Sequence, residues 1–137
     1  ARFPDADEHR FLMHPEEVNK QVPLDARSAA VVMNHNYLRD KTLVGALLTA
    51  PVPYVGALGP HERTERMLAE LQTENPSLPH TAYDKVHGPV GLDIGTETPE
   101  EIALSIIAEI QAVHHNRKGG MLRHRHGAIH ETVKMTG

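Results

Sequence analysis

The pattern of apolar and polar positions predicts short buried strands that alternate with amphipathic helices. The best strand is residues 28–33, a run that is apolar on both faces and is followed at once by a polar Asn-His pair. Residues 52–58 form a second apolar run, and a third begins at Val86 and is broken by glycines and a proline. Three strands in this order predict the centre of a sheet.

Helices are predicted between and after these strands. Asp40 is expected to cap a helix over residues 41–50, which Pro51 and Pro53 end. Gly59 and Pro60 are expected to open a second helix. The inward positions of the two helices are Leu43, Val44, Leu47 and Leu48 in the first, and Met67, Leu68 and Leu71 in the second.

The clearest helix start lies at Thr98. Thr98 is the expected N-cap, Pro99 fits the first helical position, and Glu101 completes a Thr-x-x-Glu capping box. The expected apolar stripe of this helix is Ile102, Ile106, Ile110 and Val113, widened by Ala103 and Ile107. Such a stripe requires a sheet or a second helix to cover it.

Strands that alternate with helices indicate βαβ units and a mostly parallel sheet, with helices on its faces. We therefore expect a three-layer α/β domain of Rossmann type over residues 1–116, followed by a basic, His-rich arm at residues 117–137. Residues 1–7 look turn-like and start without Met, residues 10–14 are compatible with a strand, and residues 15–21 with a short helix.

Composition narrows the functional classes. The chain has 137 residues, 39% hydrophobic and 23% charged, as in soluble globular domains, and it contains no cysteine. No apolar run reaches the length of a membrane helix, and no signal peptide is visible, so a cytoplasmic setting without membrane contact is the expectation.

The charge is distributed unevenly. Residues 1–113 carry 9 Lys/Arg against 17 Asp/Glu, whereas residues 114–137 carry 5 against 1, together with five of the eleven histidines. An acidic body argues against a nucleic-acid groove. His124-x-His126 could bind a metal weakly, but no carboxylate or cysteine lies at ligand spacing, so no specific metal site is predicted.

Three turns at the carboxyl ends of the strands are candidate ligand sites, since open parallel sheets bind ligands there. In the first turn, residues 34–37, His35 could donate to a ligand oxygen, ligate a metal or act as an acid or base. The alternative is that Asn34 and His35 only cap loop backbone.

The second turn is residues 56–63. Glycines there let backbone N–H groups approach an anion at the start of a helix, and Arg63 or Arg66 could add a phosphate contact. The sequence is neither GxGxxG nor a Walker A loop, and Glu62 would oppose an anion. A plain tight turn is the alternative.

The third turn, residues 88–95, holds three glycines and a proline in eight positions. Asp93 is either a carboxylate that faces a ligand or a partner for loop N–H groups only. No catalytic triad, nucleophile elbow or pair of catalytic carboxylates can be assigned in the chain. The three turns therefore indicate a ligand-binding scaffold better than a catalyst.

Four segments occur in a familiar order: ARFPDAD, VVMNHNYLRDKTLVGALL, PYVGALGPHERTERML and GPVGLDIGTETPEEIALSIIAEI. In these the chain resembles the C-terminal Rossmann-like domain of the XdhC/CoxI family, the accessory proteins of xanthine and carbon monoxide dehydrogenases. The resemblance covers roughly residues 1–130, with GPVGLDIG-TPEEIALSI as its most specific part. The terminal GGMLRHRHGAIH also resembles the usual ending of the family.

The resemblance implies a non-catalytic chaperone for the molybdenum cofactor (molybdopterin). Such a protein protects the cofactor while a cysteine desulfurase helps to sulfurate it, then passes it to the apo-xanthine dehydrogenase-type molybdoenzyme. The expected cofactor-binding residues are His35, Asn36, Asp40, Gly56, Gly59, Arg63, Gly88, Gly91, Asp93 and Gly95. Pro99 and Glu101 match the last motif of the family.

The chain also departs from the family pattern. It lacks the family's N-terminal domain, its glycine-rich first strand and the cysteines thought to hold molybdenum, and Gly59-Pro60-His61 replaces the usual Gly-Ser-Arg turn. We therefore expect a C-terminal fragment with an open sheet edge that a homodimer or strand exchange would cover. The alternatives are an NAD(P)- or nucleotide-binding oxidoreductase domain and a dehydrogenase-docking domain whose basic tail meets an acidic partner.

Overall fold

The computed structural model describes residues 14–127, and these form a parallel three-stranded sheet between two layers of helices. The strands are β1 (Ala30–Val32), β2 (Val55–Ala57) and β3 (Val86–His87), in the order β1-β2-β3. The predicted α/β fold with a parallel sheet is confirmed, although each strand is shorter than its apolar run. The expectations for residues 1–13 and 128–137 lie outside the described residues.

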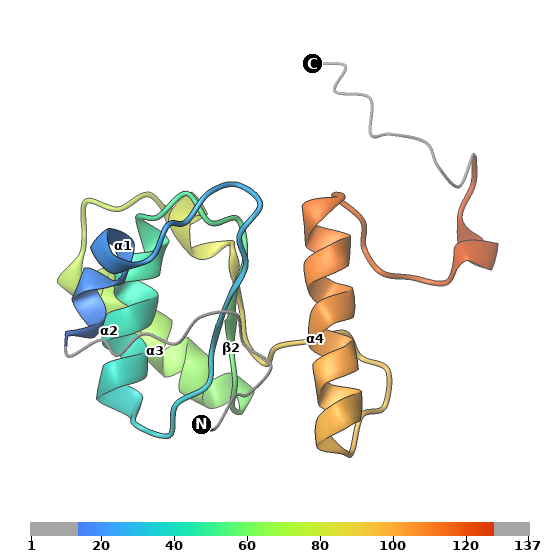
Figure 1. Ribbon diagram of the computed structural model, residues 1–137, viewed down its shortest axis with the longest axis horizontal. Coiled ribbons are helices and arrows are strands. Elements are labelled where there is room, and N and C mark those ends of the chain that lie inside the picture. Colours follow the sequence, from blue (N-terminus) through green and yellow to red (C-terminus); the bar gives the residue numbers. More distant parts are fainter. Residues whose placement is uncertain (1–13, 128–137) are drawn as a thin grey trace.

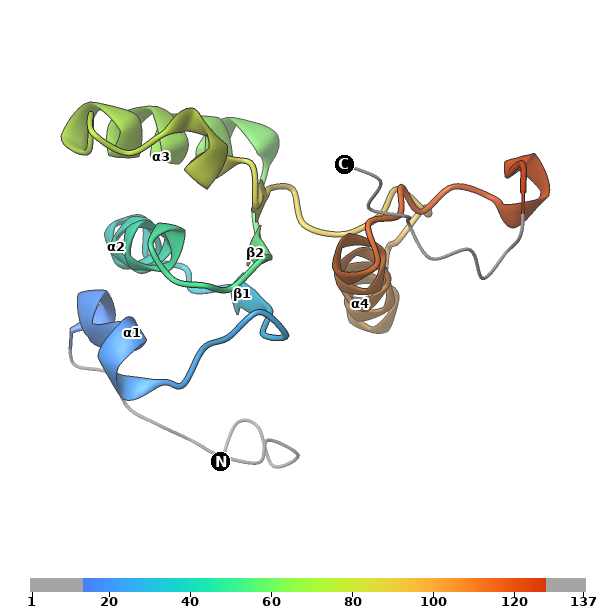
Figure 2. The same ribbon diagram turned by 90° about the horizontal axis from the view of Figure 1, so that it is seen from above.

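Figures 1 and 2 show the three layers. On one face of the sheet lie α1 (Val18–Gln21) and the crossover helices α2 (Tyr37–Leu48) and α3 (His61–Glu74), while α4 (Pro99–His114) lies on the other face. Short 3₁₀ turns are η1 (Pro15–Glu17), η2 (His80–Tyr83) and η3 (Leu122–His124). The predicted helix at residues 15–21 is therefore η1 and α1 together.

The hydrophobic core lies between the sheet and the α1–α3 layer. The predicted inward residues Val44, Leu47 and Leu48 of α2 and Met67 and Leu71 of α3 are all buried there. Strand residues alternate between the two faces, and Val32 and Val55 point into this core. Within the described residues, the core cluster includes no side chain from α4.

The expected cap at Asp40 is wrong. Helix α2 begins four residues earlier than expected, at Tyr37, with Asn36 as its N-cap, and the Asn36 Oδ1 accepts a hydrogen bond from the Arg39 N–H at 3.1 Å. Asp40 lies in the first turn, on the inner side of the helix, and is buried. Its carboxylate is thus free for a tertiary contact.

Helix α4 starts as predicted, but its buried stripe is narrower than expected. Thr98 and Glu101 form the capping box: the Glu101 N–H donates to Thr98 Oγ1 at 3.2 Å, and the Thr98 N–H donates to Glu101 Oε1 at 3.0 Å. Ile106 is buried, but Ala103 is exposed and Ile107 is 64% exposed, so neither widens the stripe toward the sheet. No helix within residues 14–127 is long and apolar enough to cross a membrane.

Candidate functional site

The three predicted turns meet at one edge of the sheet. Residues 33–36 follow β1, residues 58–60 follow β2 and residues 88–95 follow β3, so all of them leave the carboxyl ends of parallel strands. Helices α2 and α3 also begin at this edge. This carboxyl edge is where open α/β sheets bind their ligands.

A buried ion pair joins the first two turns. The Nη2 of Arg63, in the first turn of α3, lies 2.9 Å from Oδ2 of Asp40, in the first turn of α2. The Asp40 side chain is 1% exposed and the Arg63 side chain 22% exposed. The other carboxylate oxygen, Asp40 Oδ1, is buried and accepts no hydrogen bond in the part of the chain that the structure describes. A buried acceptor without a donor lowers the stability of the fold, so a hydrogen bond from a ligand to this oxygen would be favourable.

Glycine at residue 59 leaves room for the Arg63 side chain that reaches Asp40. Gly59 has a φ of +122°, which favours glycine, and a Cβ there would lie 3.2 Å from Arg63 Cδ. The guanidinium also lies 5.5 Å from the centroid of the Tyr37 ring, a cation–π contact. The conformation of Gly59 and the position of the Arg63 guanidinium are therefore linked.

The start of α3 differs from the starts of α2 and α4. Its N-cap is Pro60, which provides no side-chain cap, whereas Asn36 and Thr98 cap the other two helices. The first N–H groups of a helix have no intrahelical acceptor, and the helix dipole favours negative charge there. The start of α3, beside Arg63, can therefore accept an anionic group, although Glu62 lies in the same turn.

His35 and Asn36 have different roles in the first turn. His35 is exposed, and its side chain is open to a ligand at the carboxyl edge. The Asn36 side-chain oxygen already caps α2. A ligand contact from either residue stays a prediction.

Three of the predicted glycines have packing reasons to be glycine. Gly56 lies inside β2 rather than in a turn, and a Cβ there would lie 2.6 Å from Val90. A Cβ at Gly88 would collide with Thr64, and one at Gly91 with Ser105. The Gly91 N–H donates to Glu109 Oε1 at 2.9 Å, so this donor is already used.

The remaining residues of the third turn are open to solvent. Asp93 is exposed, and Gly95 has a φ of +76°, with no atom within 4 Å of the place that a Cβ would take. The space around Gly95 leaves room for a ligand to approach its backbone. Cofactor contacts of the third turn stay a prediction.

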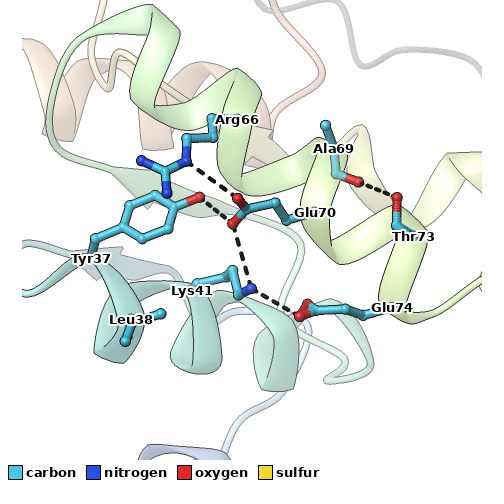
Figure 3. A pocket seen from close by; sticks show the side chains of 8 residues that line it. All are labelled: Tyr37, Leu38, Lys41, Arg66, Ala69, Glu70, Thr73 and Glu74. Carbon is cyan, nitrogen blue, oxygen red and sulfur yellow. Dashed lines mark hydrogen bonds and ion pairs between the residues drawn. The ribbon is translucent and has the colours of Figure 1, made fainter.

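A surface groove between α2 and α3 carries a network of paired charges (Figure 3). The Tyr37 hydroxyl donates to Glu70 at 2.7 Å, Lys41 Nζ lies 2.9 Å from Glu74, and Arg66 Nε lies 3.2 Å from Glu70. The hydrogen bond from Tyr37 lowers the pKa of Glu70, and the hydrogen bond to Glu74 raises the pKa of Lys41. These side chains hold the two helices together.

A second polar cluster, on the α4 face of the sheet, was missed by the sequence reasoning. The Tyr54 hydroxyl donates to Glu109 Oε1 at 2.7 Å, and His87 Nδ1 lies 3.7 Å from Glu109 Oε2. The Tyr54 and His87 rings stack at 4.7 Å, and burial followed by the bond to Glu109 raises the pKa of Tyr54. The available signal was Glu109, the one charged residue in the apolar segment 102–113.

The histidines within the described residues do not form a metal-binding cluster. Within residues 14–127, no group of three or more His, Cys, Asp or Glu side chains is placed to hold a metal ion. His124 and His126 are both exposed.

Comparison with known proteins identifies the family of this chain. The profile described as the XdhC Rossmann domain matches residues 1–110. A Bacillus subtilis (strain 168) protein, named as a probable subunit of xanthine dehydrogenase, is 38% identical over 108 residues, which are 79% of this chain and 30% of that protein. The Escherichia coli (strain K12) protein YqeB, itself described as uncharacterized, is 33% identical over 128 residues, 92% of this chain and 23% of YqeB.

A solved structure agrees with these matches. The crystal structure of a xanthine dehydrogenase (BH1974) from Bacillus halodurans superimposes with a TM-score of 0.64 at 33% identity, over 84% of this chain and 31% of that one. The chain thus spans less than a third of the length of these three relatives. Since the family profile covers most of its length, the chain belongs to the XdhC Rossmann-domain family.

Proposed function

We propose that this chain binds the molybdenum cofactor and takes part in its delivery to a xanthine dehydrogenase-type molybdoenzyme. The observation that carries the proposal is the buried Asp40–Arg63 pair at the carboxyl edge, where Asp40 Oδ1 has no donor within the described residues. Two relatives are named as a xanthine dehydrogenase or as part of one, which supports this class of partner. In this role the chain is an accessory protein that works beside a cysteine desulfurase, not a catalyst.

The residues at the carboxyl edge fit the organic part of such a cofactor. A pterin ring offers N–H donors, which suit the unpartnered oxygen of Asp40, and its phosphate suits the first turn of α3 beside Arg63. His35 is exposed at the same edge and can donate to a ligand oxygen. Because the chain has no cysteine, it holds the pterin and phosphate without a thiolate on the metal. The bound cofactor supplies the molybdenum centre used by the partner enzyme.

Titration of the chain with molybdopterin cofactor tests the proposal, with NAD(P)H and ATP as competing ligands. We expect saturable binding of the cofactor, weakened about tenfold or more by Arg63→Gln because a charge-assisted hydrogen bond to phosphate is lost. Arg27→Gln is the matched control, since Arg27 is exposed and precedes β1, at the opposite end of that strand from the carboxyl edge. This control should bind as the wild type does.

His35→Ala provides a second variant that leaves the buried pair intact. His35 is exposed, so its loss should not change the unfolding temperature, and we expect weaker cofactor binding. Absence of cofactor binding, or equal affinity in wild type, Arg63→Gln and His35→Ala, would reject the proposed site. Preferred binding of NAD(P)H or ATP would favour the nucleotide-binding alternative.

A further inference from the structure

Helix α4 and the segment after it expose apolar side chains on adjoining elements. Leu104 and Ile107 on α4 are 61% and 64% exposed, and Met121 and Leu122 in residues 116–127 are 64% and 60% exposed. Among the large apolar side chains of the described residues, only Leu38 is more exposed. Leu104 and Ile107 lie three residues apart on one side of α4, and neighbouring exposed apolar side chains of this kind mark interaction surfaces, whereas single exposed side chains do not.

Residues 117–127, the described part of the arm predicted at residues 117–137 and hereafter called the arm, project from the domain. Figure 2 shows the arm leaving the end of α4 and extending away from the side occupied by α1–α3. Gly119 packs near Leu92, where a Cβ would lie 3.1 Å from the Leu92 side chain, and η3 follows farther out with Met121 and Leu122 exposed. The arm thus presents its apolar side chains away from the core of its own domain.

Opposite charges stand at the two ends of this surface. Glu97, Glu100 and Glu101 are exposed at the start of α4. The arm holds Arg117, Lys118, Arg123 and Arg125 and no acidic residue. A helix of 16 residues is about 24 Å long, so the acidic start of α4 and the beginning of the basic arm, at Arg117 and Lys118, lie at opposite ends of the helix within one chain.

We propose that α4 and the arm form a self-complementary interface with a second copy of this chain, with the two α4 helices antiparallel. A two-fold axis across α4 brings the acidic start of each helix to the basic arm of the other copy, so the charge match is made twice. Leu104 and Ile107 of the two copies then cover each other, and the small exposed Ala103 beside them permits close approach.

Sedimentation velocity of the chain over a concentration series tests this proposal. We expect a reversible monomer–dimer equilibrium that weakens as the salt concentration rises, because exposed charge pairs are screened. The double variant Leu104→Glu/Ile107→Glu should weaken dimerisation at least about tenfold, since it puts charge at the centre of the contact. Leu38→Glu, which changes an equally exposed leucine on α2, is the matched control and should dimerise as the wild type does.

A charge swap tests the antiparallel arrangement and the identity of the partner. Glu100→Lys and Lys118→Glu should each weaken dimerisation, and the two changes together should restore it, because each residue then again meets its opposite charge. Four results would overturn the proposal: a wild type that is monomeric at every concentration, undiminished dimerisation of Leu104→Glu/Ile107→Glu, no rescue in the charge-swapped chain, or a surface that associates with a different protein only.

Discussion

The two faces of the sheet are built on different principles. The face toward α2 and α3 is closed by apolar side chains, among them Val44, Val55 and Met67, which have 1% exposure or less. The face toward α4 is joined through polar groups centred on Glu109, which accepts hydrogen bonds from the Tyr54 hydroxyl and the Gly91 N–H. The first face therefore supplies most of the stability, and the second depends on a few directional contacts.

This difference explains where the candidate site lies. Asp40 and Arg63 are fixed at the starts of α2 and α3, whose inner sides are locked into the core, so the buried pair stands on rigid supports. On the other face, Glu109 and two further contacts tie α4 down: the Leu92 N–H donates to the Ser105 carbonyl at 3.1 Å, and His114 Nε2 lies 3.3 Å from the Ser28 carbonyl. Asp40 and Arg63, which carry the proposed ligand site, and the proposed dimer contact on α4 thus lie on opposite sides of the sheet.

The largest effect is expected in the core between the sheet and α3. Met67→Ala should lower the free energy of unfolding by about 3 kcal/mol, because it removes a fully buried side chain and leaves a cavity. Leu104→Ala, on the outer side of α4, should change it by less than about 0.5 kcal/mol. Urea unfolding at low protein concentration measures both values, and similar losses would contradict the asymmetry.

A smaller loss is expected at the polar junction under α4. Glu109→Ala leaves the buried Tyr54 hydroxyl without its acceptor, at a cost of about 2 kcal/mol. Glu109→Gln keeps an acceptor oxygen and should cost less. Urea unfolding of the two variants ranks their stabilities, and a greater loss of stability in Glu109→Gln than in Glu109→Ala would disprove this role of Glu109.

Two glycines allow a matched comparison of the site with the arm. Gly59→Ala should cost about 1–2 kcal/mol, since alanine disfavours the positive φ and its Cβ would crowd Arg63. Gly120→Ala meets no atom within 4 Å and should have almost no effect. Thermal unfolding compares the pair, and equal stability of the two variants would refute the constraint at residue 59.

The smallest effect concerns the pH dependence of the α4 cap. Hydrogen bonds from the Thr98 and Glu97 N–H groups lower the pKa of Glu101 from its ordinary value of 4.5. The stabilisation from this carboxylate is therefore complete above about pH 4.5 and is lost as the pH falls through the lower folded-state pKa. Glu101→Gln keeps a capping side chain without the titration, so its stability should fall less below pH 4.5 than that of the wild type. Acid-unfolding curves in which the wild type and Glu101→Gln lose the same stability below pH 4.5 would contradict this role of the Glu101 carboxylate.

Local signals in the sequence predicted the elements well. Thr98, Pro99 and Glu101 place the start of α4 correctly because a capping box acts within one turn. The same capping rule predicts Asp40 as the N-cap of α2, which is wrong, because the N-cap is Asn36. Both residue types cap helices, and only the tertiary contact with Arg63 shows that Asp40 belongs inside.

Contacts between distant parts of the chain could not be predicted in this way. The sequence indicated that the three turns meet at one edge, because strands that alternate with helices run parallel and their carboxyl ends then share one edge of the sheet. It did not indicate that Tyr54 bonds to Glu109, 55 residues away, or that Gly56 serves packing within β2. Whether Ile107 is covered also depends on the sheet's width and on the partners of α4, which periodicity does not encode.

Hydrogen exchange of the chain with and without molybdopterin cofactor tests the central claim most directly, that the ligand site lies at the carboxyl edge supported by the α2–α3 core. In the free chain, amides of α4 should exchange faster than those of α2 and α3. On addition of the cofactor, protection should increase at residues 33–40 and 58–63 and remain unchanged on the outer side of α4. Protection confined to α4 or the arm, or no change anywhere, would contradict the account.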